Sequence, residues 1–110
     1  EALQAAGNDV PGALKRFMGS EAMYLKFLAK LPQDETYAQL HTALEAGDAQ
    51  AGFAAAHTLK GLFGNLGLTK LVEFNSSLVE TMRAGGLPQA DEVVAFDAEY
   101  RATLGVLAGI

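Results

Sequence analysis

A histidine set among glycines is the part of this chain whose residue types could do chemistry. It opens the segment His57-Thr58-Leu59-Lys60-Gly61-Leu62-Phe63-Gly64-Asn65-Leu66-Gly67, which has the apolar spacing of a helix. Each interior glycine costs a helix about 1 kcal/mol relative to alanine, so an ordinary helix does not keep two of them without a reason. A neutral imidazole is a nucleophile, and Lys60, three residues later, is within reach of an anion attached to it. The segment therefore indicates a working surface around His57.

Helical rotation of about 100° per residue predicts which side chains of this segment face the core. The predicted core stripe consists of Ala51, Ala55, Leu59, Leu62, Phe63 and Leu66. The opposite face carries His57, and beside it lie Gln50, Phe53, Ala54, Lys60, Gly61 and Gly64. Phe53 either lies beneath the first helix or belongs to an apolar docking surface. We expect the two glycines to clear this outward face for another protein.

The whole chain has the composition of one small helical domain. It has 110 residues, half of them hydrophobic, and only three prolines, which indicates a single all-α domain over residues 1–110. The absence of cysteine excludes disulfides and thiolate metal sites. A net charge of −5 disfavours a nucleic-acid partner. No apolar run approaches the roughly 18 to 20 residues of a membrane span, so we expect no direct membrane contact.

Apolar residues at spacings of three and four, bounded by caps and breakers, predict six helices. Their approximate ranges are 10–19, 20–32, 34–47, 48–67, 68–85 and 91–107. The last four are long and joined by short turns, so neighbours should alternate in direction. The predicted fold is an antiparallel up-down four-helix bundle with two short N-terminal helices packed across it.

These residues carry a family likeness: the chain resembles a histidine-containing phosphotransfer (HPt) domain of multistep two-component phosphorelays. The likeness covers essentially the whole chain and rests on Ala56-His57-Thr58-Leu59-Lys60-Gly61, Gly64, Leu66-Gly67, Leu71 and Leu78, with Val10 to Tyr24 and Leu44-Glu45-Ala46-Gly47-Asp48 upstream. It implies a phosphoryl carrier. An exposed histidine accepts a phosphoryl group from the aspartyl phosphate of a receiver domain and relays it to the aspartate of another receiver.

The resemblance also implies a role for individual residues and a set of partners. His57 is the phosphoacceptor, Lys60 stabilises the phosphoryl group, and partner docking involves Gly61, Gly64, Phe53, Gln50, Phe17 and Met18. The partners are receiver domains of a hybrid sensor histidine kinase, a response regulator or both. We expect a cytoplasmic monomer, or the cytoplasmic part of a membrane-bound hybrid sensor kinase, that binds no cofactor and leaves Mg²⁺ to the receiver. Because no nucleotide-binding motif is present, we do not expect an enzyme.

Two features depart from the family's pattern. Positions 62 and 63, commonly small, are Leu62 and Phe63, which face the core side and should alter packing more than chemistry. Many members carry Gln or Glu twenty-two residues after the histidine, where it orients the imidazole; here that position is Val79. Asn75, one turn earlier, either bonds to neighbouring backbone or water, or partly replaces the missing orienting residue.

Two other functions fit parts of the sequence. A phosphorylation-independent helical docking module would use the same surface with an inert His57. A metal or hydrolytic enzyme using His57 and His41 has weaker support, because the two are sixteen positions apart on different predicted helices without a His-Glu-x-x-His spacing. We expect His41 to be a surface residue without a role.

Overall fold

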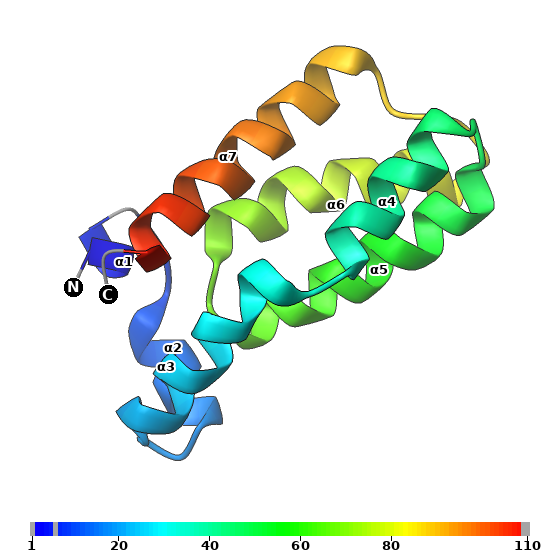
Figure 1. Cartoon of the computed structure of the whole chain (residues 1–110). Coiled ribbons are helices and arrows are strands. Elements are labelled where there is room, and N and C mark those ends of the chain that lie inside the picture. The colour runs from blue at the N-terminus through cyan, green and yellow to red at the C-terminus, as the bar shows by residue number, and fades with distance from the viewer. Residues whose placement is uncertain (1, 6, 109–110) are drawn as a thin grey trace.

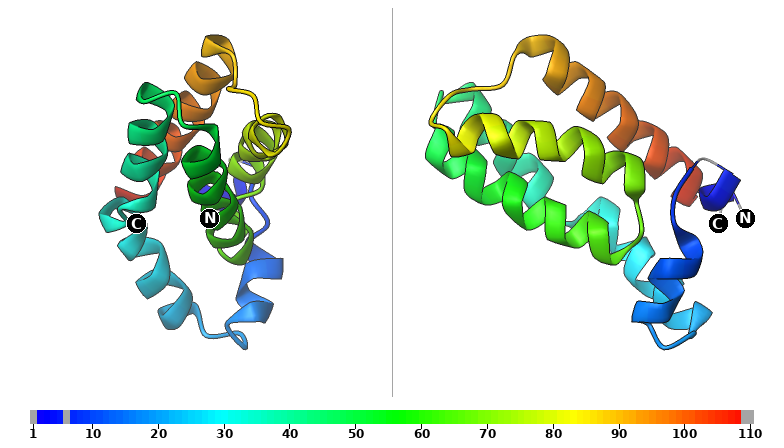
Figure 2. Two further views of the ribbon diagram at one scale, coloured as in Figure 1. Left: turned by 90° about the vertical axis from the view of Figure 1, so that its right-hand side faces the viewer. Right: turned by 180° about the vertical axis from the view of Figure 1, so that it is seen from behind.

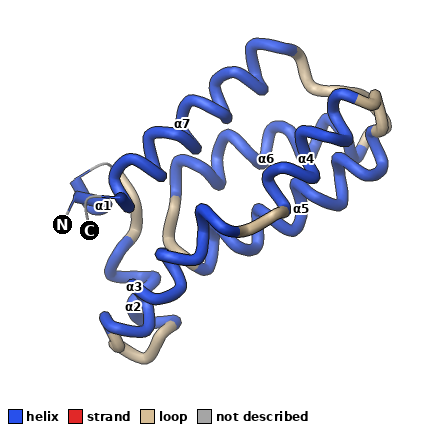
Figure 3. The backbone as a smooth tube through the Cα atoms, in the orientation of Figure 1, coloured by secondary structure: helices blue, strands red, loops and turns tan. Residues whose placement is uncertain are grey.

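The computed structural model describes residues 2–5 and 7–108, and every regular element within them is a helix, as predicted (Figures 1 and 3). The elements are α1 (Ala2–Ala5), α2 (Val10–Arg16), α3 (Glu21–Lys30), the 3₁₀ helix η1 (Leu31–Gln33), α4 (Thr36–Glu45), α5 (Ala49–Asn65), α6 (Thr69–Arg83) and α7 (Ala90–Ala108). The short α1 and η1 were not predicted. None of the described helices combines the length and apolarity needed to cross a membrane.

Local capping accounts for several of the helix boundaries. Ser20 and Asp48 each accept a hydrogen bond from a backbone N–H three residues later, at 3.2 and 3.0 Å, as N-caps do. Gly19 and Gly47 follow the ends of α2 and α4 with φ of +77° and +68°, a conformation that glycine adopts without strain. Helix α4 begins at Thr36, two residues after the predicted cap at Asp34. The Asp34 side chain accepts a hydrogen bond from the backbone N–H of Thr36, the first residue of the helix.

Helices α4–α7 lie alongside one another, and α2 and α3 lie together at one end of the molecule (Figures 1 and 2). Helix α5 packs mainly against α4 and α6, and α6 packs against α7. Tyr37 of α4 stacks on Tyr100 of α7 with ring centroids 3.8 Å apart. The large side chains with almost no exposure include Phe63, Phe96, Leu28, Leu31, Leu40, Leu59, Leu66, Leu68, Leu71 and Leu78.

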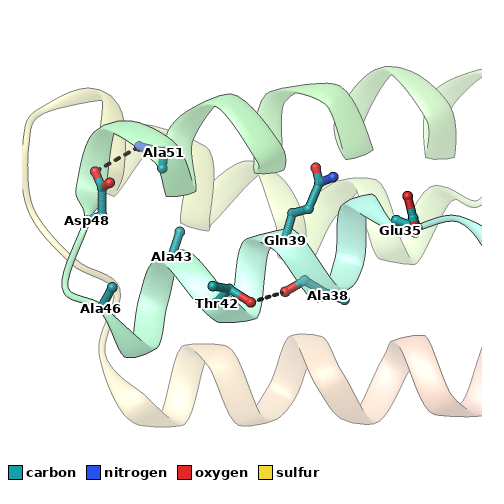
Figure 4. A pocket seen from close by; sticks show the side chains of 8 residues that line it. All are labelled: Glu35, Ala38, Gln39, Thr42, Ala43, Ala46, Asp48 and Ala51. Atoms are coloured by element: carbon teal, nitrogen blue, oxygen red, sulfur yellow. Dashed lines mark hydrogen bonds between the residues drawn. The ribbon is translucent and has the colours of Figure 1, made fainter.

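The core face of α5 follows the helical wheel except near its start. Ala55, Leu59, Phe63 and Leu66 are buried and Leu62 is half-buried, but Ala51 is exposed, so its assignment to the core was wrong. Ala51 lines an open hollow of about 470 Å³ between α4 and α5, whose other lining residues are Glu35, Ala38, Gln39, Thr42, Ala43, Ala46 and Asp48 (Figure 4). Many of these side chains are alanines, which are too short to close the space.

Candidate functional site

His57 lies near the middle of α5 with its side chain exposed to solvent. Beside it is an open hollow of about 400 Å³, lined by Arg16, His57, Lys60, Gly61, Gly64 and Asn65. The structure thus places Lys60 and the two glycines on the same surface as the histidine, as the wheel predicted. The hydrogen bonds drawn in the other hollow, between α4 and α5, only support the two helices (Figure 4). The backbone N–H of Ala51 donates to the Asp48 side chain at the start of α5, and the Thr42 hydroxyl donates to the carbonyl oxygen of Ala38 within α4.

The two site glycines are not there to let helices pack closely. A Cβ atom built on Gly61 or on Gly64 meets nothing within 4 Å. By contrast, a Cβ on Gly52, in the same helix, would lie 2.6 Å from the sulfur of Met82, so Gly52 is the packing glycine of α5. Gly61 and Gly64 instead leave the surface beside His57 without side chains, although no neighbouring atom of the described residues is close enough to require a glycine there.

Two cations line the hollow beside His57, and only Lys60 is predicted from the sequence. Lys60 is half-buried one turn after His57, while Arg16 is exposed at the last position of α2. Over the described part of the chain, neither side chain has a hydrogen bond or an ion pair. No local pattern predicts Arg16, since its place beside His57 depends on how α2 packs on the end of α5.

Phe53 contacts the imidazole directly. The rings of Phe53 and His57, one turn apart on α5, stack with centroids 5.7 Å apart and planes inclined by 19°. The guanidinium carbon of Arg83 lies 5.2 Å from the centroid of the Phe53 ring, and Arg83 also pairs with Glu80 at 3.4 Å. Phe53 is therefore half-buried between its own helix and α6.

Position 79, which the resemblance gives as the site of a residue that orients the histidine, holds a buried apolar side chain. Val79 is completely buried, and no residue of the described chain forms a hydrogen bond with the imidazole of His57. Asn75 is also buried and donates from Nδ2 to the carbonyl oxygen of Ala56 at 2.8 Å. It therefore bonds to backbone, the first of its two expected roles, and holds α6 to α5 next to the histidine.

The other predicted docking residues lie outside the hollow. Gln50 is exposed near the start of α5. Phe17 is half-buried, with its ring 5.6 Å from that of Tyr24 and 5.3 Å from that of Phe27. Met18 follows it in the turn after α2 and is 95 % exposed. The α2–α3 turn thus presents an apolar side chain to solvent at the same end of the molecule as Arg16.

His41 is not the inert surface residue that we expected. Its Nε2 lies 2.7 Å from Oδ1 of Asp97, and the hydroxyl of Tyr37 donates to the same oxygen at 2.5 Å. Burial, reinforced by this hydrogen bond, raises the pKa of Tyr37 well above its ordinary value. The cluster connects α4 to α7. Among the described residues, no three potential ligands from His, Cys, Asp and Glu come together to hold a metal ion.

Comparison with known proteins gave one result. A family model described as "Hpt domain" matches residues 22–108, which is most of the chain. Neither the curated proteins nor the solved structures gave a significant match. The matched segment includes α4–α7 and His57, whereas α2, with Arg16, precedes it.

Proposed function

Because the chain belongs to the Hpt domain family, whose members carry phosphoryl groups in phosphorelays, we propose that His57 accepts a phosphoryl group from one receiver domain and passes it to another. The observation that carries the proposal is the combination of an exposed histidine, a lysine that pairs with no described residue and two surface glycines with open space beside them. A partner's active site can reach His57 without displacing any side chain at Gly61 or Gly64.

The proposed step is a displacement at phosphorus. The lone pair of the unprotonated ring nitrogen of His57 forms the nitrogen–phosphorus bond. The bond from phosphorus to the partner's aspartyl oxygen breaks, and its electron pair leaves with the carboxylate. The proton on the other ring nitrogen can then pass to water. The reverse sequence of bonds delivers the group to the next receiver.

This chain contributes position and charge to that step. Phosphoryl transfer depends mainly on alignment and on neutralising the phosphoryl oxygens, with little covalent chemistry left to the protein. Lys60, one helical turn from His57, supplies a positive charge for those oxygens. We propose that Mg²⁺ belongs to the receiver and that this domain binds no metal itself.

The stack with Phe53 supports a positioning role for that residue. A reactive histidine is usually oriented by a partner on its second nitrogen, but Val79 offers none here. The Phe53 ring instead stacks on the imidazole with the two planes inclined by 19°. We propose that this contact, supported by Arg83 on the Phe53 ring, takes over part of the orienting role.

The fold supports the same function. We infer that α4–α7 form an antiparallel four-helix bundle within one domain, with α2 and α3 packed across one end. In this arrangement the working face of α5 points away from the bundle core, and the domain needs no second copy to complete it. A monomer that meets receiver domains one at a time fits this geometry.

The two histidines of the chain allow a matched test. The intact domain is incubated with phosphorylated receiver domains, and an acid-labile, alkali-stable phosphoryl group is measured on the wild type, on His57→Gln and on His41→Gln. We expect label on the wild type and on His41→Gln, and none on His57→Gln. Circular dichroism checks that both variants fold, because His41 bonds to Asp97.

Two results would contradict the proposal. Label that persists in His57→Gln would move the phosphoacceptor elsewhere. Receivers that bind the domain without transferring a phosphoryl group would support the docking module, in which His57 is chemically inert.

A further inference from the structure

Arg16 is the one residue of the hollow beside His57 that comes from outside α5. It occupies the last position of α2, and within the described chain its guanidinium has no hydrogen-bond or ion-pair partner. Of the eight Lys and Arg residues in a chain of net charge −5, Arg16 and Lys60 line this hollow. The two cations thus form a local positive site on an acidic molecule.

A close backbone contact places α2 against this end of α5. The backbone N–H of Asp9 donates to the carbonyl oxygen of Gly67 at 2.8 Å. A Cβ atom on Gly67 would lie 2.4 Å from the carbonyl oxygen of Asp9 and 2.9 Å from Cβ of Ala13, so only glycine permits this approach. The hydroxyl of Tyr24 adds a bond to the carbonyl oxygen of Leu66 at 2.8 Å. The position of Arg16 is therefore built into the packing of the α2–α3 pair.

We propose that Arg16 is a second ligand of the phosphoryl group on His57, acting with Lys60; this inference rests on the proposed function. A phosphoryl group on a side chain carries about two negative charges near pH 7, and one lysine neutralises only one of them. A guanidinium supplies the second charge and can bind two phosphoryl oxygens at once. Because Arg16 precedes the matched residues 22–108, the family match itself does not assign this role.

A small phosphodonor tests this role without a partner protein, so that an effect on docking cannot be mistaken for an effect on the phosphoryl group. Phosphoramidate can phosphorylate His57 directly: the nitrogen–phosphorus bond to the ring forms, the donor's own nitrogen–phosphorus bond breaks, and its nitrogen leaves with a proton as ammonia. The intact domain is labelled in this way as wild type, Arg16→Ala, Arg16→Lys and Lys15→Ala. Lys15 is the matched control, since it is an exposed cation in the same turn of α2 that does not line the hollow.

We expect Arg16→Ala to lower the labelling rate by about tenfold and to shorten the lifetime of the phosphohistidine, the size expected for losing a charge-assisted hydrogen bond. Arg16→Lys should recover part of this loss, because it keeps the charge but not the two-pronged geometry. Lys15→Ala should stay within about twofold of the wild type, because its charge lies outside the hollow. In NMR spectra, the Nε–Hε signal of Arg16 should shift on phosphorylation, while that of Arg101 should not.

Three results would overturn the inference. Arg16→Ala could label as fast as the wild type, Lys15→Ala could lose as much as Arg16→Ala, or Arg16→Ala could be slow only with phosphorylated receivers. The last result would make Arg16 a docking residue. If instead the wild type accepts label from phosphoramidate but never from receivers, the proposed relay function fails while the role of Arg16 stands.

Discussion

Alanine substitutions at two glycines of α5 should differ in their effect on stability, and only the one at Gly61 should increase it. Gly61 and Gly52 lie in the same helix, but a Cβ on Gly61 meets nothing within 4 Å, whereas a Cβ on Gly52 lies 2.6 Å from the sulfur of the buried Met82. Gly61→Ala therefore gains helix propensity without a clash, about 1 kcal/mol in the free energy of unfolding. For a domain of this size that raises the melting temperature by about 4 °C.

Gly52→Ala has the same gain in propensity but must displace Met82 in a closed core. Overpacking of this kind costs about 1–3 kcal/mol, so the net result ranges from no change to a loss of about 2 kcal/mol. Thermal and urea unfolding followed by circular dichroism measures both variants. The reasoning fails if Gly61→Ala is less stable than the wild type, or if Gly52→Ala gains as much as Gly61→Ala.

A larger side chain at the exposed glycine separates stability from function. Gly61→Leu should remain at least as stable as the wild type, because its side chain extends into open space. It should nevertheless block transfer from a phosphorylated receiver, since the leucine stands beside His57 where the partner approaches. Labelling by phosphoramidate, which needs little room, should be largely retained. Normal transfer from receivers would show that Gly61 does not clear a docking surface.

Three further predictions concern Lys60, Phe53 and Tyr37. Lys60→Ala should slow transfer by about tenfold with an unchanged circular dichroism spectrum, while Lys26→Ala, an exposed control on α3, should have no effect. Phe53→Leu keeps apolar bulk but removes the stacked ring, so labelling by phosphoramidate should slow several-fold with an unchanged circular dichroism spectrum; an unchanged labelling rate would reduce Phe53 to a packing residue. The folded state raises the pKa of Tyr37, so the folded protein keeps this proton at pH values at which the unfolded chain loses it. The free energy of unfolding should therefore fall as the pH rises above about 10. Tyr37→Phe should lessen that fall in urea midpoints measured from pH 7 to 11.

Features set by neighbouring residues could be predicted from the sequence. The caps at Ser20 and Asp48 depend on bonds to the backbone three residues away, so side-chain chemistry and spacing are enough to locate them. The outward orientation of His57 follows from a constant rotation per residue along one helix. The same geometry placed Lys60, Gly61 and Gly64 beside it, and the structure has them there.

Contacts between residues that are far apart in the sequence could be found only from the tertiary structure. Arg16 lines the hollow beside His57 because α2 is placed there by the close backbone contact between Asp9 and Gly67, which are fifty-eight positions apart. The contact of His41 with Asp97 likewise joins α4 to α7. The sequence by itself determined which helix face carries the histidine, since helix geometry is local. Only the packing of helices decided what surrounds that histidine, because such contacts depend on how the whole chain fills its core.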